Sequence, residues 1–268
     1  MNIKKIDVLV ILGSLISFVL FFVLLRDIST GHLIQMQTKI LGQILIETQG
    51  FTIFETLFSL ISPFLLPFLG LAFLVLGFVI LAFYGKQYQN HIGILIGAIS
   101  AVLSLLFFSF SLVSIFVGIS LFVSCIYILP LANTYFKEFK KWKKFRLGSR
   151  TVSTILLIFN IVLAVGVFTE VHLNSEYKEN YKEDLTDTIT QIGARSTPMD
   201  PTGQIDKETI KEAFEKKIKD SPLVESAIRL LPLTIAAMVW VILEFLRTII
   251  LGNLGGGLSY IILRFSRT

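Results

Sequence analysis

Residues that commonly perform chemistry are scarce in this sequence. The chain has one cysteine, Cys125, and three histidines, so it cannot form an intrachain disulfide and has few ligands for a metal. The motifs HExxH, GxxxxGK[ST] and GxSxG, which mark metallohydrolases, phosphate-binding loops and serine hydrolases, are missing from the sequence. We therefore predict that the protein is not an enzyme and has no catalytic residue, metal or cofactor. An enzyme acting on lipids would have to use scattered loop residues: Asp27, His32, Glu47 and Glu55.

Charge is also sparse. Asp, Glu, Lys and Arg make up 16% of the chain, whereas soluble proteins average about 25%. Hydrophobic residues account for 54% of the chain, and the mean hydropathy is +0.76. They form long uncharged runs, and a helix of about 20 apolar residues is enough to cross a membrane. The sequence therefore predicts an all-α integral membrane protein.

The lengths of the apolar runs predict a bundle of six spans. The run 56–85 is longer than one crossing, and Pro63 and Pro67 are expected to kink or break it because proline removes a backbone donor. The run 92–132 is long enough for two spans, which we expect to be joined by a turn near 109–114. In chain order the predicted spans are 8–25, 64–84, two within 92–132, 152–168 and about 233–250.

A basic segment sets the expected orientation of these spans. The residues KEFKKWKKFRLGSR, at 137–150, include five lysines, two arginines and a single acid. Short loops rich in Lys and Arg remain in the cytoplasm, so we expect a cytoplasmic loop at 133–151 and both termini on the same side. Aromatic residues alternate with these cations, which predicts contact with anionic lipid headgroups rather than with nucleic acid, because a span lies on each side. The predicted headgroup contacts are Lys137, Lys140, Lys141, Lys143, Lys144 and Arg146.

Two segments are expected outside the bilayer on the opposite face. Apolar residues recur at helical spacing in 28–52, which predicts an amphipathic helix on the outer surface, although an extended segment packed on the bundle is an alternative. Residues 171–222 are expected to form a helical hairpin within an extracytoplasmic segment at 171–225. Ser221 and Pro222 are a typical start for the helix that leads into span six.

The predicted organisation has three parts. Residues 1–132 form a four-span bundle that includes 28–52, and 133–151 form the basic loop. Residues 152–268 contain span five, the hairpin, span six and a cytoplasmic tail. The tail includes GNLGGG, which suggests a flexible hinge followed by a surface-lying or re-entrant segment.

A few residues within the spans are candidates for a solute pathway or for helix packing. Asn160 lies near the middle of span five, and Glu244 and Arg247 are three residues apart on span six, in the last turns before the cytoplasmic side. Broken helices line binding sites in transporters, so Pro63 and Pro67 join this set. The alternative is a structural role, in which Asn160 fixes helix packing and the two charges pair at the membrane–water interface.

Two functions fit these features. The first is a non-enzymatic membrane subunit or scaffold, which forms a homo-oligomer or binds another membrane protein through its spans and its outer hairpin. The alternative is a channel or small-solute transporter that uses the polar residues within the spans. A polar face shared by several spans would favour a pore, whereas helix seams filled by side chains would favour a scaffold.

Overall fold

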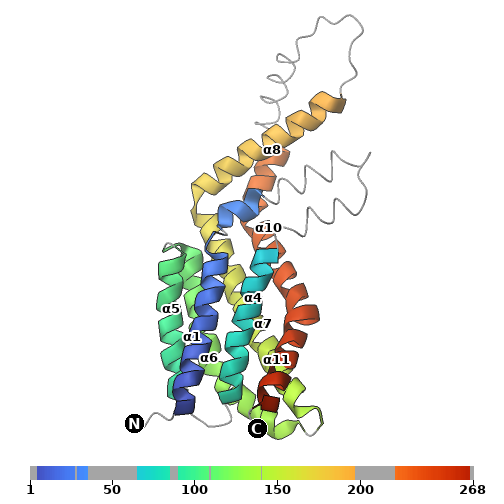
Figure 1. Cartoon of the computed structure of the whole chain (residues 1–268). Coiled ribbons are helices and arrows are strands. Elements are labelled where there is room, and N and C mark those ends of the chain that lie inside the picture. The colour runs from blue at the N-terminus through green and yellow to red at the C-terminus, as the bar shows by residue number, and fades with distance from the viewer. Residues whose placement is uncertain are drawn as a thin grey trace, which may run out of the picture. The chain divides into compact units, whose positions relative to one another are not determined.

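A computed structural model describes residues 5–27, 29–35, 65–84, 90–108, 110–139, 141–196 and 221–265 (Figure 1). All regular secondary structure in these residues is helical, which confirms the predicted all-α class. The chain divides into two compact units. Unit 1 comprises Met1–Asp27, Ile61–Val167 and Ala236–Thr268, and unit 2 comprises Ile28–Leu60 and Phe168–Ile235.

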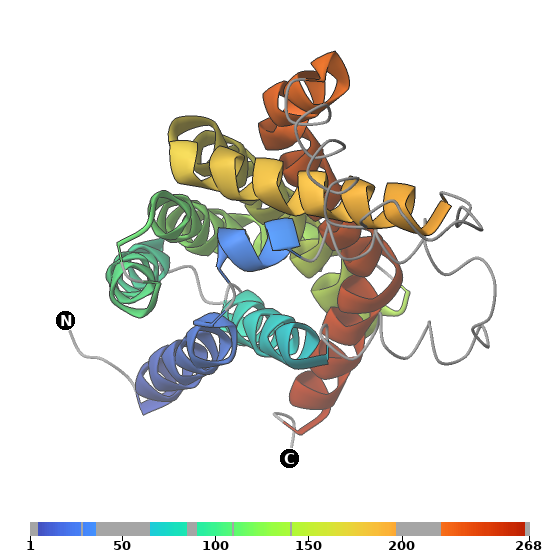
Figure 2. The same cartoon turned by 90° about the horizontal axis from the view of Figure 1, so that it is seen from above.

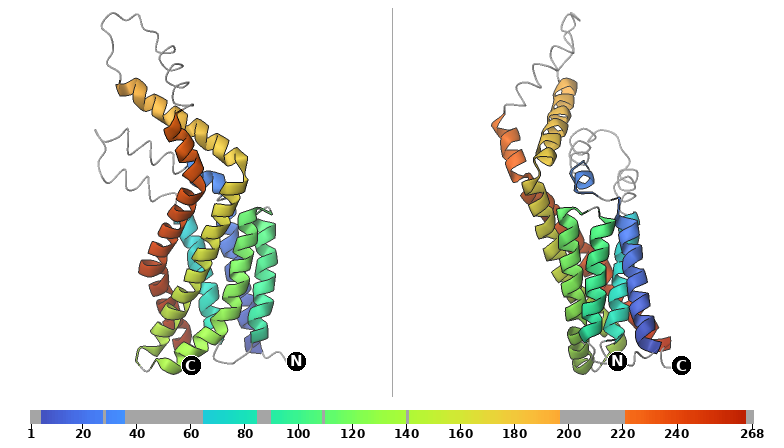
Figure 3. Two further views of the ribbon diagram at one scale, coloured as in Figure 1. Left: turned by 180° about the vertical axis from the view of Figure 1, so that it is seen from behind. Right: turned by 90° about the vertical axis from the view of Figure 1, so that its left-hand side faces the viewer.

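Unit 1 is a helical bundle in which successive helices run antiparallel, except that α10, η3 and α11 follow one another in the same direction (Figures 1 and 3). Viewed along the helices, α1 lies beside α4, and α5 lies beside α6 (Figure 2). Because the directions alternate, α1 begins and α11 ends at the same end of this unit. The helices that contribute to it are α1 (Lys5–Leu25), α4 (Leu65–Tyr84), α5 (Asn90–Phe107), α6 (Leu112–Glu138), α7 (Lys143–Leu173), α10 (Pro222–Leu246), the π-helical turn η3 (Arg247–Leu251) and α11 (Gly252–Phe265).

Five helical stretches in the described residues are long and apolar enough to cross a membrane, which agrees with the predicted membrane protein class. The apolar part of α5, His91–Phe107, is shorter than these five. A sixth crossing at α5 therefore stays a prediction. The five stretches are Val8–Leu25, Leu65–Phe83, Leu112–Glu138, Lys143–Leu173 and Val224–Arg264.

Aromatic side chains fill the centre of unit 1. Phe18, Phe22 and Phe78 are fully buried, and the rings of Phe18 and Phe78 meet edge to face with centroids 5.5 Å apart. The ring of Phe21 contacts that of Phe159 at 6.3 Å. These contacts join α1 to α4 and to α7. Because lipid is as apolar as these side chains, close packing rather than escape from solvent holds the helices together.

Helix α5 ends at Phe107 and α6 begins at Leu112, so the chain reverses close to 109–114, where the sequence predicts a turn. Ser111 caps α6, because its side chain accepts a hydrogen bond of 3.1 Å from the backbone of Ser114. Phe110 has a φ of 55°, in the left-handed region. The connection between α6 and α7 is shorter than the predicted loop, because α6 continues to Glu138 and α7 begins at Lys143.

Two predicted helix starts can be compared with the structure. Helix α10 begins at Pro222, as the Ser221–Pro222 pair predicts. Pro67 is the third residue of α4, where a backbone donor is not needed, and the helix continues unbroken to Tyr84. Pro63, most of 28–52 and the second half of the predicted hairpin lie outside the described residues.

The prediction of a glycine hinge in the tail is wrong. Residues 252–265 form α11, and its glycines allow this helix to approach α7 closely. A side chain at Gly148 would collide with the carbonyl oxygen of Gly255 and with the Cβ of Ser259. The hydroxyl of Ser259 also donates a hydrogen bond of 2.8 Å to the carbonyl oxygen of Lys144. The small residues therefore serve contact between helices, as in other membrane bundles.

This contact generates a prediction. Gly148→Ala should lower the free energy of unfolding by about 1 to 3 kcal/mol, because the added methyl group forces α7 and α11 apart. The control is Gly257→Ala on α11, the helix that Gly148 contacts, where an added Cβ meets nothing within 4 Å. This control should be neutral or stabilising, since alanine favours helix over glycine. Thermal unfolding in detergent measures both, and equal losses of stability would contradict the packing of α11 on α7.

Candidate functional site

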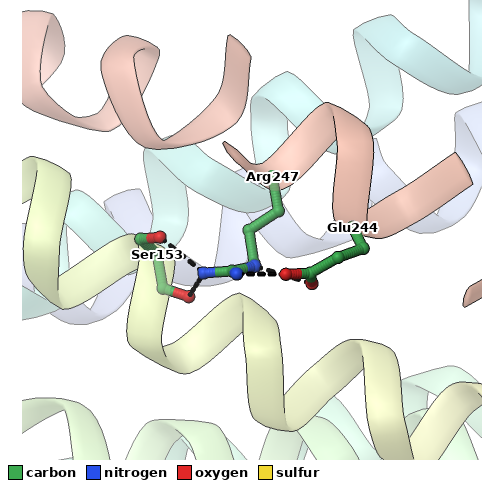
Figure 4. A network of polar contacts seen from close by, with 3 residues as sticks. All are labelled: Ser153, Glu244 and Arg247. Carbon is green, nitrogen blue, oxygen red and sulfur yellow. Dashed lines mark hydrogen bonds and ion pairs between the residues drawn. The ribbon is translucent and has the colours of Figure 1, made fainter. Parts of the chain in front are cut away.

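The structure brings together the three polar residues that the sequence singled out within the spans. Glu244 and Arg247 share one face of the α10 to η3 path, since they are three residues apart. Asn160 and Ser153 share a face of α7, since they are separated by about two helical turns. Figure 4 shows that the side chains of Glu244 and Arg247 extend from one helical segment toward Ser153 on another.

Arg247 is the centre of this cluster. Its Nε donates a hydrogen bond of 2.8 Å to Oε2 of Glu244, and its Nη2 pairs with Oε1 of the same carboxylate. Its Nη1 donates to the hydroxyl of Ser153 at 2.7 Å and to the Ser153 carbonyl oxygen at 3.1 Å (Figure 4). A bidentate pair of this kind is geometrically specific, and the two added bonds fasten α7 to the start of η3.

Asn160, about two turns after Ser153 on α7, is the fourth residue of the cluster. Its side chain is buried, with 3% of its surface exposed, and its amide interacts with the Glu244 carboxylate. This interaction falls short of a regular hydrogen bond, because Nδ2 has no hydrogen-bond partner among the described residues. A buried amide donor without a partner is costly. Asn160 is therefore a polar group held beside the ion pair and able to bind an additional acceptor.

The helical path that carries the ion pair is longer than the predicted span six, which ends at about 250. It continues through η3 and α11 to Phe265. Arg247 contacts Ser153 on α7. Because an α-helix rises 1.5 Å per residue, Ser153 lies about 15 Å from Lys143, where α7 begins. A charge within hydrocarbon costs about 2.5 to 3.5 kcal/mol on insertion scales. Pairing offsets this cost, and the two side chains keep only 17% and 25% of their surface exposed.

The π-helical turn η3 begins at Arg247 itself. The N–H of Gly252 donates to the carbonyl oxygen of Arg247, five residues earlier, so the turn is wider than an α-helical one. Short π-helical segments inside α-helices occur frequently at functional sites. Neither η3 nor the role of Ser153 was predicted. The hydroxyl of a serine in an apolar span usually donates to a backbone carbonyl of its own helix. The residues around Ser153 therefore give no indication that it contacts an arginine on another helix.

A second polar cluster lies in unit 2. Glu170, near the end of α7, is buried, and its Oε1 accepts hydrogen bonds from the hydroxyls of Thr30 at 2.9 Å and Tyr177 at 3.2 Å. Burial raises the pKa of the Tyr177 phenol to about 12, and the charge of Glu170 acts in the same direction. The phenol therefore remains a protonated donor at neutral pH. Tyr177 lies on α8 (Ser175–Ser196), which forms where the first hairpin helix was predicted.

The predicted headgroup contacts lie at the ends of α6 and α7. Lys137, Lys141 and Arg146 are exposed, whereas the Nζ of Lys143 lies 3.7 Å from the centroid of the Phe136 ring. Lys140 is outside the described residues. In the part of the chain that the structure describes, no group of three or more His, Cys, Asp or Glu residues is arranged to hold a metal ion.

Comparison with known proteins found no similarity that assigns a function. No family model matches the chain, and no curated protein or solved structure matches it.

The Glu244–Arg247 pair generates a second prediction. Glu244→Gln and Arg247→Gln should each destabilise the protein by about 1 to 3 kcal/mol, because each leaves a charge without its partner in a poorly solvated place. The double variant should lose less than the sum of the two, since it leaves no unpaired charge. Thermal unfolding in detergent measures this coupling.

The control pair is Arg26 and Asp27, whose side chains are 60% and 81% exposed. Arg26→Gln and Asp27→Asn should show almost no coupling, as is usual for pairs in water. Equal coupling at the two pairs would contradict a special role for the cluster around Arg247.

Proposed function

We propose that this chain is a polytopic membrane subunit or scaffold without enzymatic activity. It associates with a second copy or with another membrane protein through its spans and its outer segments. The observation that carries this proposal is the closed seam between α5 and α6. An added Cβ at Gly93 would strike the carbonyl oxygen of Cys125, and one at Gly97 would lie 3.1 Å from the Cα of Phe122. Seams filled in this way support a packed assembly module rather than a water-filled pore.

The proposed topology has six crossings, with both termini in the cytoplasm and 171–225 outside. Its support is the distribution of charge. The ends of α6 and α7 carry the basic residues of 137–150, whereas the segment 170–225 contains 13 acidic and eight basic residues. Such a bias matches the rule that positive loops stay inside.

Helix α10 offers a surface for association within the membrane. The side chains of Leu233, Trp240, Val241 and Phe245 are exposed on it. In a bilayer these residues contact either lipid or the spans of a partner. We propose that they contribute to the assembly surface together with the outer hairpin.

The experiment that tests this proposal is purification of the tagged protein in mild detergent, followed by native mass determination. A second copy or another protein should be present in a fixed ratio. Replacing 176–220 with a short linker should abolish this association, while the thermal unfolding of the remaining bundle stays the same. A monomer without a partner, both with and without the segment, would contradict the scaffold proposal.

One observation favours the alternative of a channel or small-solute transporter. The cluster of Ser153, Glu244 and Arg247 is polar, lies within the helical path and adjoins a π-helical turn, while the Asn160 amide has a donor to offer. The same purified protein, reconstituted into vesicles, discriminates the two functions. Solute or ion flux that Asn160→Leu abolishes, with assembly intact, would favour transport, whereas the scaffold proposal predicts no flux to lose.

A further inference from the structure

Three helix ends meet at the end of unit 1 where α6 gives way to α7. The Nζ of Lys143, on α7, lies over the ring of Phe136 on α6. The Nζ of Lys144 lies 5.9 Å from the centroid of the Tyr260 ring on α11, and the Lys144 carbonyl oxygen accepts the bond from Ser259. The views in Figures 1 and 3 show the C-terminal end of α11 beside the connection between α6 and α7. These contacts hold the three ends as one surface, which we call the basic end.

The basic end carries a strong excess of positive charge. Its cations come from all three helices, and Glu138 is the one acid among the described residues at 135–150 and 258–264. Within the described part of the chain, no acid forms an ion pair with Lys141, Arg146 or Arg264, all of which are exposed. The basic residues of this surface are Lys137, Lys141, Lys143, Lys144, Arg146, Arg150 and Arg264.

Trp142 lies between Lys141 and Lys143 in the connection from α6 to α7. Its side chain is 77% exposed, although tryptophan is one of the largest apolar side chains. Its backbone has a φ of 55°, which L-residues rarely adopt, and this conformation occurs in the short connection just before α7 begins. A tryptophan ring favours the headgroup layer of a membrane, where its apolar body and its N–H are both accommodated. The position of Trp142 therefore indicates a lipid interface rather than water.

We propose that the basic end binds anionic phospholipids, whose phosphate groups contact the exposed cations while the Trp142 ring lies in the headgroup layer. Lys and Arg donate charge-assisted hydrogen bonds to phosphate oxygens. A zwitterionic lipid carries a cation next to its phosphate and has no net charge, so the same surface attracts it less strongly than an anionic lipid. The roles within the surface differ. Lys143 and Lys144 are held against aromatic rings, which leaves Lys141, Arg146 and Arg264 as the main contacts. This inference does not depend on the proposed scaffold function.

The two tryptophans of the chain permit a direct test. Trp240→Phe leaves Trp142 as the only tryptophan, and Trp142→Phe leaves Trp240, in α10, as the matched control. Each variant is placed in nanodiscs of phosphatidylcholine that contain a small fraction of lipid spin-labelled near the headgroup. The label is carried either by phosphatidylglycerol or by phosphatidylcholine. Labelled phosphatidylglycerol should quench Trp142 fluorescence about two- to fivefold more strongly than labelled phosphatidylcholine, and both should quench Trp240 equally, since favourable charge enriches lipid locally.

Charge variants in the Trp240→Phe background identify the cause. Substituting Gln for Lys141, Arg146 and Arg264 should bring the ratio of quenching close to one. Substituting Gln for Lys178, Lys182 and Arg229, which lie in unit 2, should leave the ratio unchanged. Salt at high concentration should lower the ratio for the parent, because ions screen exposed charges. Equal quenching of Trp142 by the two lipids, weak quenching by both, or a preference that survives loss of the three cations would overturn the proposal.

Discussion

Close contact between helix backbones is the interaction on which this structure depends. In hydrocarbon, apolar side chains gain nothing by exchanging lipid for protein, so helices associate through tight packing and hydrogen bonds. Gly93 allows α5 to approach Cys125 on α6, and Gly148 allows α11 to approach α7 at Gly255. The second contact aligns the path through α10, η3 and α11 along α7. Arg247, on the same path, also bonds to Ser153 on α7, so the glycine contact and the polar cluster join the same two segments.

The low polarity of the same environment explains the composition of that cluster. A lone Glu244 or Arg247 would be expensive within the helical path, but the pair is internally neutral and Ser153 takes up a further donor group of the arginine. Asn160 is the exception, because its amide lies beside the carboxylate and yet keeps a donor without a partner. A fully satisfied pair fastens two helices, which suits a scaffold. The remaining donor is the feature that a transporter would use.

Much of the architecture follows from the sequence, and the exceptions share a physical cause. The length of an apolar run sets the length of a helix, so the helices Lys5–Leu25 and Leu65–Tyr84 lie where they were predicted. Glycine-rich segments are poor helix formers in water, which is why 252–257 was interpreted as a hinge. A backbone in lipid must satisfy its polar groups internally, which favours a helix over a hinge, and the structure has α11 at these residues. Contacts between helices, such as that of Arg247 with Ser153, depend on how two helices are positioned along and around each other. The residues of either helix alone do not indicate this position.

We propose that the basic end and the segment 170–225 lie on opposite sides of a membrane that the chain crosses an even number of times. Cys125 is buried and is the chain's sole cysteine, so Cys125→Ser provides a background without thiols. Single cysteines at Lys141, Asp184 and Arg264 can then be labelled in sealed, oriented vesicles with a maleimide that does not cross membranes. The proposed topology predicts that positions 141 and 264 react from one side and position 184 from the other. Labelling of 141 and 264 from opposite sides would contradict it.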